Sequence, residues 1–195
     1  MKILRKSSFV ATPWKNGGGI THEAIRVPTH GDSFRWRISV AEIAVSGPFS
    51  DFSGYTRAMV LLRGAGVRLK FSDGRQKILR EIGDLVEFDG ALATQCELLA
   101  GGCADLNLIV AKSMQLARVH IEQLLTVLSI PTSHHESTII FCVDGALSLV
   151  SVGGKSEVLG PWDLAVISDT GATRLAPLSH STATMVFLAT LRAQS

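Results

Sequence analysis

The sequence predicts an all-β fold made of two fused β-barrels. Short apolar or alternating runs recur along the chain, turn-forming residues separate them, and landmarks of the first half return roughly 80 residues later. Of the 195 residues, 46% are hydrophobic and 18% are charged, and the mean hydropathy is +0.28. This composition is typical of a compact globule and excludes a disordered chain.

Residues 34–41 form the clearest strand pattern. Apolar side chains take the even positions from 34 to 40 and polar ones the odd positions from 35 to 39, so Trp36 and Arg37 are expected on opposite faces. Further short strands are expected at residues 58–62, 66–71, 85–88 and 106–110. Turn signals separate these runs at residues 46–48, 53–54, 73–74, 89–90 and 101–102. Short strands with regular turns favour a sandwich or a barrel.

Residues 116–128 are rich in Leu, Ala, Glu and Gln, which favours a helix. However, Ala117, Val119 and Ile121 alternate with polar residues, and this period of two favours a strand. The strand would carry the chain from one half to the other, with residues 130–133 (Ile-Pro-Thr-Ser) as the linker.

The second half repeats the landmarks of the first. Gly64 and Gly145 each open a pair of strands, and an Asp-Leu pair follows at Asp84 and Asp163 before a buried run. The nearly constant offset indicates duplication of one barrel. We therefore expect an N-terminal barrel at residues 1–115 and a C-terminal barrel at residues 116–195, packed as one compact unit.

Charge and apolar patterning exclude several classes of partner. The net charge is +2 and no run of like charge occurs, so no nucleic-acid partner is expected. No segment approaches the roughly 18 apolar residues of a membrane span, and the N-terminus lacks a secretory apolar region. The three cysteines show no CxxC spacing, which is typical of free thiols in a reducing compartment. A cytoplasmic protein without a membrane partner is expected.

Residues 13–19 read Pro-Trp-Lys-Asn-Gly-Gly-Gly, the most informative motif of the chain. Three glycines let a backbone pass close to another group, and the upstream side chains supply an aromatic face, a cation and an amide. This heptad is either the rim of a binding pocket or a strand-ending turn with polar decoration.

The duplicated barrel and several strings resemble the HutD/Ves family of the cupin superfamily. The strings are residues 13–19 with Thr21, residues 36–39, 47–50, 62–66 and 88–90, and the Asp-Leu-Asn of residues 105–107. The resemblance implies a bicupin of the RmlC-like jelly-roll type. It further implies binding of a small carboxylate such as formylglutamate and a modulating role in histidine utilisation or a stress response. No established catalytic activity comes with it.

Metal and nucleophile motifs are missing from the sequence. Cupins commonly hold a metal through a His-x-His pair, and none of the six histidines forms one. The adjacent pair His134 and His135 lies beside the expected linker. No Gly-x-Ser-x-Gly elbow and no phosphate-binding glycine loop occurs. Neither a metal nor another cofactor is therefore expected.

Anion binding is the chemistry that the polar residues favour, because arginine forks suit carboxylates. Near the motif strings lie cations, amides and aromatic rings, and the candidate ligand-binding residues are Trp14, Lys15, Asn16, Trp36, Arg37, Arg57 and Asn107, with Arg35 as a further cation. The alternatives are solvated strand faces for the arginines and core packing for Trp36. Asp105 and Asn107 could instead fasten the heptad loop by hydrogen bonds.

The first hypothesis is thus a metal-free bicupin that binds a small carboxylate in its first barrel. Lys15 and one arginine would neutralise the carboxylate, and Asn16 with Asn107 would orient its polar tail. One rival is a metal-independent isomerase or hydrolase acting on such an acid. Another is a protein-interaction module. A homodimer paired through strand edges is compatible with the fold.

Overall fold

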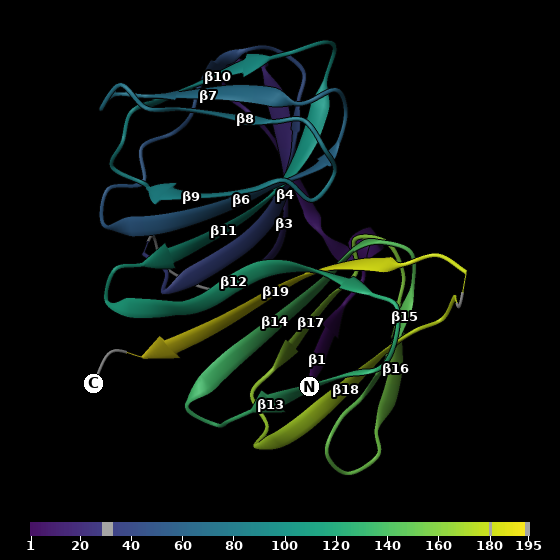
Figure 1. The fold of residues 1–195 in the computed structure, drawn as a ribbon. Coiled ribbons are helices and arrows are strands. Elements are labelled where there is room, and N and C mark those ends of the chain that lie inside the picture. Colours follow the sequence, from purple (N-terminus) through teal and green to yellow (C-terminus); the bar gives the residue numbers. More distant parts are fainter. Residues whose placement is uncertain (29–32, 180, 194–195) are drawn as a thin grey trace. The chain divides into compact units, whose positions relative to one another are not determined.

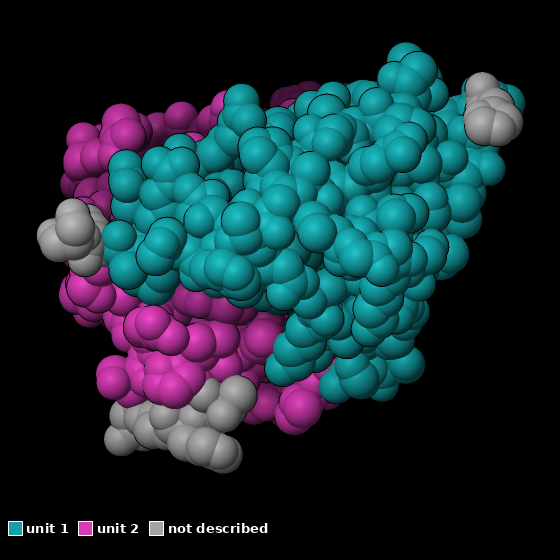
Figure 2. Space-filling view, turned by 90° about the horizontal axis from the view of Figure 1, so that it is seen from below, with its two compact units in different colours: residues 1–8, 114–195 teal, residues 9–113 magenta. Residues whose placement is uncertain are grey.

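The computed structural model describes residues 1–28, 33–179 and 181–193, and their regular secondary structure consists of β-strands and one short 3-10 helix, η1 (Lys6–Ser8) (Figure 1). The chain divides into two compact units (Figure 2). We call Phe9–Ser113 the N-terminal barrel, and Met1–Ser8 together with Met114–Ser195 the C-terminal barrel. No helix in the described part of the chain is long and apolar enough to cross a membrane.

The N-terminal barrel pairs two antiparallel sheets. One has the strand order β2-β3-β4-β11-β6-β9 and the other β5-β10-β7-β8. Their strands are β2 (Val10–Pro13), β3 (Gly19–Val27), β4 (Trp36–Ile43), β5 (Gly47–Pro48), β6 (Tyr55–Arg63), β7 (Val67–Phe71), β8 (Gln76–Leu79), β9 (Leu85–Asp89), β10 (Thr94–Leu98) and β11 (Cys103–Ala111).

The C-terminal barrel is built in the same way, from sheets of order β1-β17-β14-β19-β12 and β13-β18-β15-β16. Its strands are β1 (Lys2–Leu4), β12 (Met114–Leu124), β13 (Leu128–Thr132), β14 (Glu136–Asp144), β15 (Leu147–Val150), β16 (Ser156–Leu159), β17 (Leu164–Ile167), β18 (Gly171–Pro177) and β19 (Thr184–Ala193).

Strand order shows the predicted duplication directly. The run β4-β11-β6-β9 corresponds to β12-β19-β14-β17, and β5-β10-β7-β8 corresponds to β13-β18-β15-β16. The irregularities also correspond. Near its first residues β11 shifts register against β6, and β19 shifts register against β14 in the same way. The all-β fold and the strand over residues 116–128 are confirmed, the latter as β12.

Two details differ from the sequence-based expectation. The linker at residues 130–133 is wrong, because Ile130 and Pro131 lie in β13 and pair with β18. Pro131 is tolerated there since β13 is an edge strand, where a missing N–H costs little. The other difference concerns residues 1–8, expected in the first barrel. Lys2 pairs with Val166 of β17, so this segment belongs to the C-terminal barrel.

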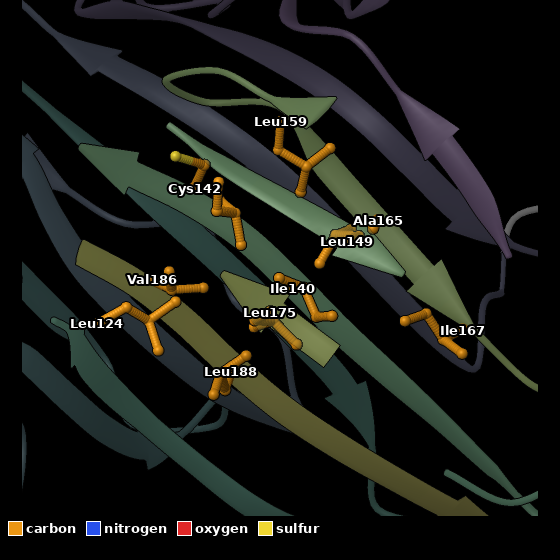
Figure 3. Close-up of a cluster of buried hydrophobic side chains, with 11 residues drawn as sticks. Leu124, Ile140, Cys142, Leu149, Leu159, Ala165, Ile167, Leu175, Val186 and Leu188 are labelled. Atoms are coloured by element: carbon orange, nitrogen blue, oxygen red, sulfur yellow. The ribbon is translucent and has the colours of Figure 1, made fainter. Parts of the chain in front are cut away.

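Each barrel has its own apolar core. Figure 3 shows that of the C-terminal barrel, where Ile140 on β14, Leu175 on β18, and Val186 and Leu188 on β19 pack together. The core of the N-terminal barrel includes Met59 on β6. Arg57 lies two positions from Met59 and therefore on the same face of the strand. The core thus continues directly into a polar region.

Candidate functional site

A cavity of about 700 Å³ lies within the N-terminal barrel. The residues that line it come from β2 to β6 and β11 and from the loops at Trp14–Asn16 and Phe49–Phe52. Six of the seven sequence-predicted candidates are among these lining residues: Trp14, Lys15, Asn16, Arg37, Arg57 and Asn107.

Trp36 is the exception. The sequence predicted that it lines the pocket, and the structure places it outside the lining. It does not line the cavity and is only 4% exposed. Trp36 and Arg37 are neighbours on β4, so their side chains point to opposite faces of the sheet, and Arg37 takes the face of the cavity. The further cation Arg35 is exposed and also lies outside the lining.

The heptad forms the turn between β2 and β3. The backbone N–H of Trp14 donates to the Gly19 carbonyl at 2.9 Å, and that of Gly17 donates to the Trp14 carbonyl at 3.0 Å. Gly17 has a φ of +70°, a conformation that glycine adopts without strain. The Trp14 indole N–H donates to the Thr21 hydroxyl at 2.8 Å, which fixes the ring at the cavity wall.

Gly19 allows a close approach of backbone and ring. A Cβ at this position would lie 2.4 Å from the Glu42 carbonyl oxygen and 3.2 Å from the Trp14 ring. The Asn16 side-chain oxygen accepts the Gly18 N–H at 3.0 Å, so this acceptor serves the loop itself. The glycines therefore pack the loop tightly, and the Asn16 side-chain oxygen stabilises the turn.

Arg57 is the centre of the site. It is 5% exposed, and its Nη2 donates to Asn107 Oδ1 at 2.7 Å. The guanidinium carbon lies 5.0, 5.3 and 4.9 Å from the ring centroids of Phe49, Phe52 and Phe88. Its Nε is buried without a hydrogen-bond partner among the described residues. Since a guanidinium carries five N–H donors, donors remain for a group in the cavity.

Asp105 completes a hydrogen-bonded line with Asn107 and Arg57. Asn107 Nδ2 donates to Asp105 Oδ1, while Asp105 Oδ2 is buried without a partner in the described structure. Burial raises the pKa of Asp105 to about 7, against the opposing effects of the Arg57 charge and the Asn107 hydrogen bond. Burial likewise lowers the pKa of Arg57 to about 10, although Asp105 acts to raise it.

This line changes the expected roles of two residues. The sequence offered Asp105 and Asn107 as fasteners of the heptad loop, but their side-chain hydrogen bonds run to each other and to Arg57. Asp105 was missed as a site residue. The available signal was its spacing of two from Asn107, which places both side chains on one face of β11.

Further charges surround the cavity. Arg37 Nη1 lies 4.0 Å from Glu23 Oε2, and Arg26 Nε lies 3.6 Å from Glu23 Oε1. Burial lowers the pKa of Arg37, and Glu23 partly offsets this effect. Lys15 is exposed at the rim. The lining thus holds four cationic side chains against two acidic ones, an excess that favours an anion.

Metal-ligating residues do not gather in the described structure. No group of three or more His, Cys, Asp or Glu side chains that could hold a metal ion occurs there. His30 and His180 lie outside the described residues. Burial raises the pKa of the thiols of Cys96, Cys103 and Cys142 to about 12, so these cysteines have little thiolate character.

Known proteins resemble this chain over most of its length. The family model described as HutD matches residues 6–185. An uncharacterized 21.2 kDa protein in the hutC 3' region of Pseudomonas putida is 35% identical over 164 residues, which cover 84% of each chain. Protein Ves of Escherichia fergusonii is 31% identical over 109 residues, covering 55% of this chain and 56% of Ves.

Solved structures agree with these matches. A conserved protein of unknown function from Pseudomonas aeruginosa PAO1 has a TM-score of 0.87 at 29% identity, covering 98% of both chains. HutD from Pseudomonas fluorescens SBW25 has a TM-score of 0.83 at 27% identity, covering 100% of this chain and 99% of HutD. Oxalate decarboxylase from Lactobacillus farciminis, a cupin, has a TM-score of 0.66 at 10% identity, covering 97% and 85%, and shows the fold alone. The predicted bicupin fold is confirmed.

Proposed function

The chain belongs to the HutD family, and from this membership and the cationic cavity we propose that it binds a small organic carboxylate in its N-terminal barrel. The buried guanidinium of Arg57 carries the proposal. Charge-assisted hydrogen bonds from arginine to carboxylate are among the strongest that a protein makes, and burial strengthens them. The aromatic rings around the Arg57 guanidinium position it, and its unpartnered Nε can donate to a planar anion.

Other residues of the lining fit secondary roles. Arg37 and the rim residue Lys15 supply further positive charge. Asn107 uses its oxygen on Arg57 and its N–H group on Asp105, so it positions the arginine, and the tail of the ligand is left to Asn16. No metal is needed for this chemistry.

The residues of the C-terminal barrel favour one ligand site per chain, located in the N-terminal barrel. Matching the register of β11 and β19 places Val186 where the first barrel has Asp105, and Leu188 where it has Asn107. Thr138 takes the place of Arg57 in the same way. The corresponding interior is an apolar core that contains Val186 and Leu188. One ligand per chain is therefore expected.

The relatives suggest the physiological setting. One relative is encoded in a hutC 3' region and another is named HutD. We place this chain, on that basis, in histidine utilisation as a cytoplasmic binding protein that modulates the pathway. N-formylglutamate, a small acid with two carboxylates and a polar formamide, fits a cavity with several cations and an available amide donor.

Calorimetric titration of the full chain with N-formyl-L-glutamate and urocanate tests the proposal, with the dimethyl ester of formylglutamate as the uncharged control. We expect one site per chain and no heat from the ester. Arg57→Met should weaken binding roughly 30-fold or more, because one partner of a buried charge pair is lost. Arg35→Met removes an exposed cation just before β4, outside the cavity, and should bind like the parent. No heat at millimolar acid, or equal binding by Arg57→Met, would overturn the proposal.

Turnover is the rival outcome. Asp105, with a pKa raised to about 7, could exchange a proton with a bound acid as a general base does. NMR spectra of N-formylglutamate incubated with the parent protein and with Asp105→Asn distinguish the two functions. Unchanged ligand in both samples supports binding, and conversion by the parent alone supports catalysis.

A further inference from the structure

The buried line from Arg57 through Asn107 to Asp105 joins the anion-binding end of the cavity to a carboxyl group. We propose that Asp105 takes up a proton when an anion binds at Arg57, so that the cavity receives its ligand together with a proton. This inference rests on the proposed function. It adds a charge-compensating role for Asp105, which contacts no part of the ligand in that proposal.

Asn107 makes the coupling direct. Its Oδ1 accepts from Arg57 and its Nδ2 donates to Asp105, so the amide bridges the two charges and its orientation is fixed. The Arg57 charge favours the ionised form of Asp105 in the empty site. An anion on Arg57 neutralises that charge and adds a negative charge beside a fully buried carboxylate. Both changes favour the protonated form.

Neighbouring elements offer little to replace Arg57. Opposite Asp105 lie Ala41 on β4 and Leu61 on β6, which are both apolar. The other charged or titratable groups facing this region are Lys15 at the rim, Arg37 on β4, Glu23 and Arg26 on β3, Cys103 on β11 and Cys96 on β10. Arg37 faces Glu23, and the thiols keep their protons at neutral pH because their pKa is about 12.

The proton has a defined place. Oδ1 of Asp105 accepts the Asn107 N–H, while Oδ2 is the oxygen without a partner among the described residues. Solvent or buffer supplies the proton, and it forms an O–H bond at Oδ2 as the anion enters. Because burial raises the pKa of Asp105 in the empty site to about 7, the carboxyl titrates in the neutral range and the uptake is measurable there.

Binding should therefore weaken as the pH rises. Between the pKa of the empty site and the higher pKa of the occupied one, the affinity falls up to tenfold per pH unit. Below that window the carboxyl is protonated in both states, and the affinity is independent of pH.

Calorimetry of N-formyl-L-glutamate binding at pH 7, in buffers with different ionisation enthalpies, measures the proton directly. The carboxyl groups of this probe are already ionised, so uptake belongs to the protein. We expect a clear fraction of one proton for the parent and none for Asp105→Asn, whose affinity should not change between pH 6 and 8. Glu87→Gln makes the same acid-to-amide change on β9 outside the cavity lining and should take up the parent amount.

The outcomes separate the two proposals. Binding by the parent without dependence on the buffer overturns the inference and leaves the proposed function standing, as does uptake that persists in Asp105→Asn. Absence of any binding overturns the proposed function and the inference with it. Should Asp105→Asn fail to fold, ¹³C NMR titration of the Asp105 carboxyl in the parent replaces it. A pKa that rises on saturation with the probe supports the inference, and an unchanged pKa overturns it.

Discussion

Replacing Asp105 with Asn should change how the stability of the ligand-free protein depends on pH. The pKa of this carboxyl is about 7 in the folded state, against an ordinary value of 3.8. Between these values the folded state binds more protons than the unfolded state, so stability falls as the pH rises. At 1.36 kcal/mol per pKa unit, the free energy of unfolding decreases by about 4 kcal/mol in total once the pH exceeds 7. Asparagine does not titrate and removes this loss.

Urea unfolding at pH 4, 5.5, 7 and 8.5, followed by tryptophan fluorescence, measures the effect. Other titrating groups cancel when the two proteins are compared at each pH. The stability of Asp105→Asn relative to the parent should rise by about 4 kcal/mol from pH 4 to pH 8.5, with most of the change below pH 7. Glu81→Gln removes an exposed acid and should follow the parent. A difference between Asp105→Asn and the parent that stays constant with pH refutes the assigned pKa.

Two further predictions concern packing and reactivity. Gly19→Ala should destabilise the protein by about 1–3 kcal/mol in urea unfolding, because its Cβ would meet the Glu42 carbonyl, whereas Gly47→Ala meets no atom within 4 Å and should stay within about 0.5 kcal/mol. Equal effects of the two alanines would contradict the close packing at Gly19. The cysteine thiols are buried, so Ellman's reagent at pH 8 should label none in the native protein and all three after denaturation. Fast labelling of the native protein would contradict their burial.

The fold could be predicted from local patterns that are recognisable in a single sequence. Alternation in residues 34–41 depends only on the strand period of two, and the structure forms the strand β4 from Trp36 onward. The same rule excluded Trp36 from any pocket that contains Arg37, since neighbours on a strand face opposite ways. The linker failed for a related reason. Proline disfavours a central strand, but Pro131 lies in an edge strand. The local sequence does not reveal which strand lies at the edge of a sheet.

The centre of the site depends on a longer-range fact. Arg57 meets Asn107 because β6 and β11 pair in one register, and a shift between Ala104 and Asp105 helps set it. A slip of one residue would turn every side chain of β11 to the other face. The sequence could therefore name the cations and amides, but it could not join Arg57 to Asp105 across 48 positions.

The duplication itself argues that the polar line serves a function. Both barrels share strand order and register, yet one fills the positions of Asp105 and Asn107 with Val186 and Leu188. That apolar arrangement shows that the fold does not need a buried charge there. Buried ion pairs are often no more stabilising than apolar side chains of similar volume, and their desolvation cost is several kcal/mol per ion. The first barrel bears this cost in a cavity whose lining carries excess positive charge, and the proposed binding of an anion at Arg57 would offset it.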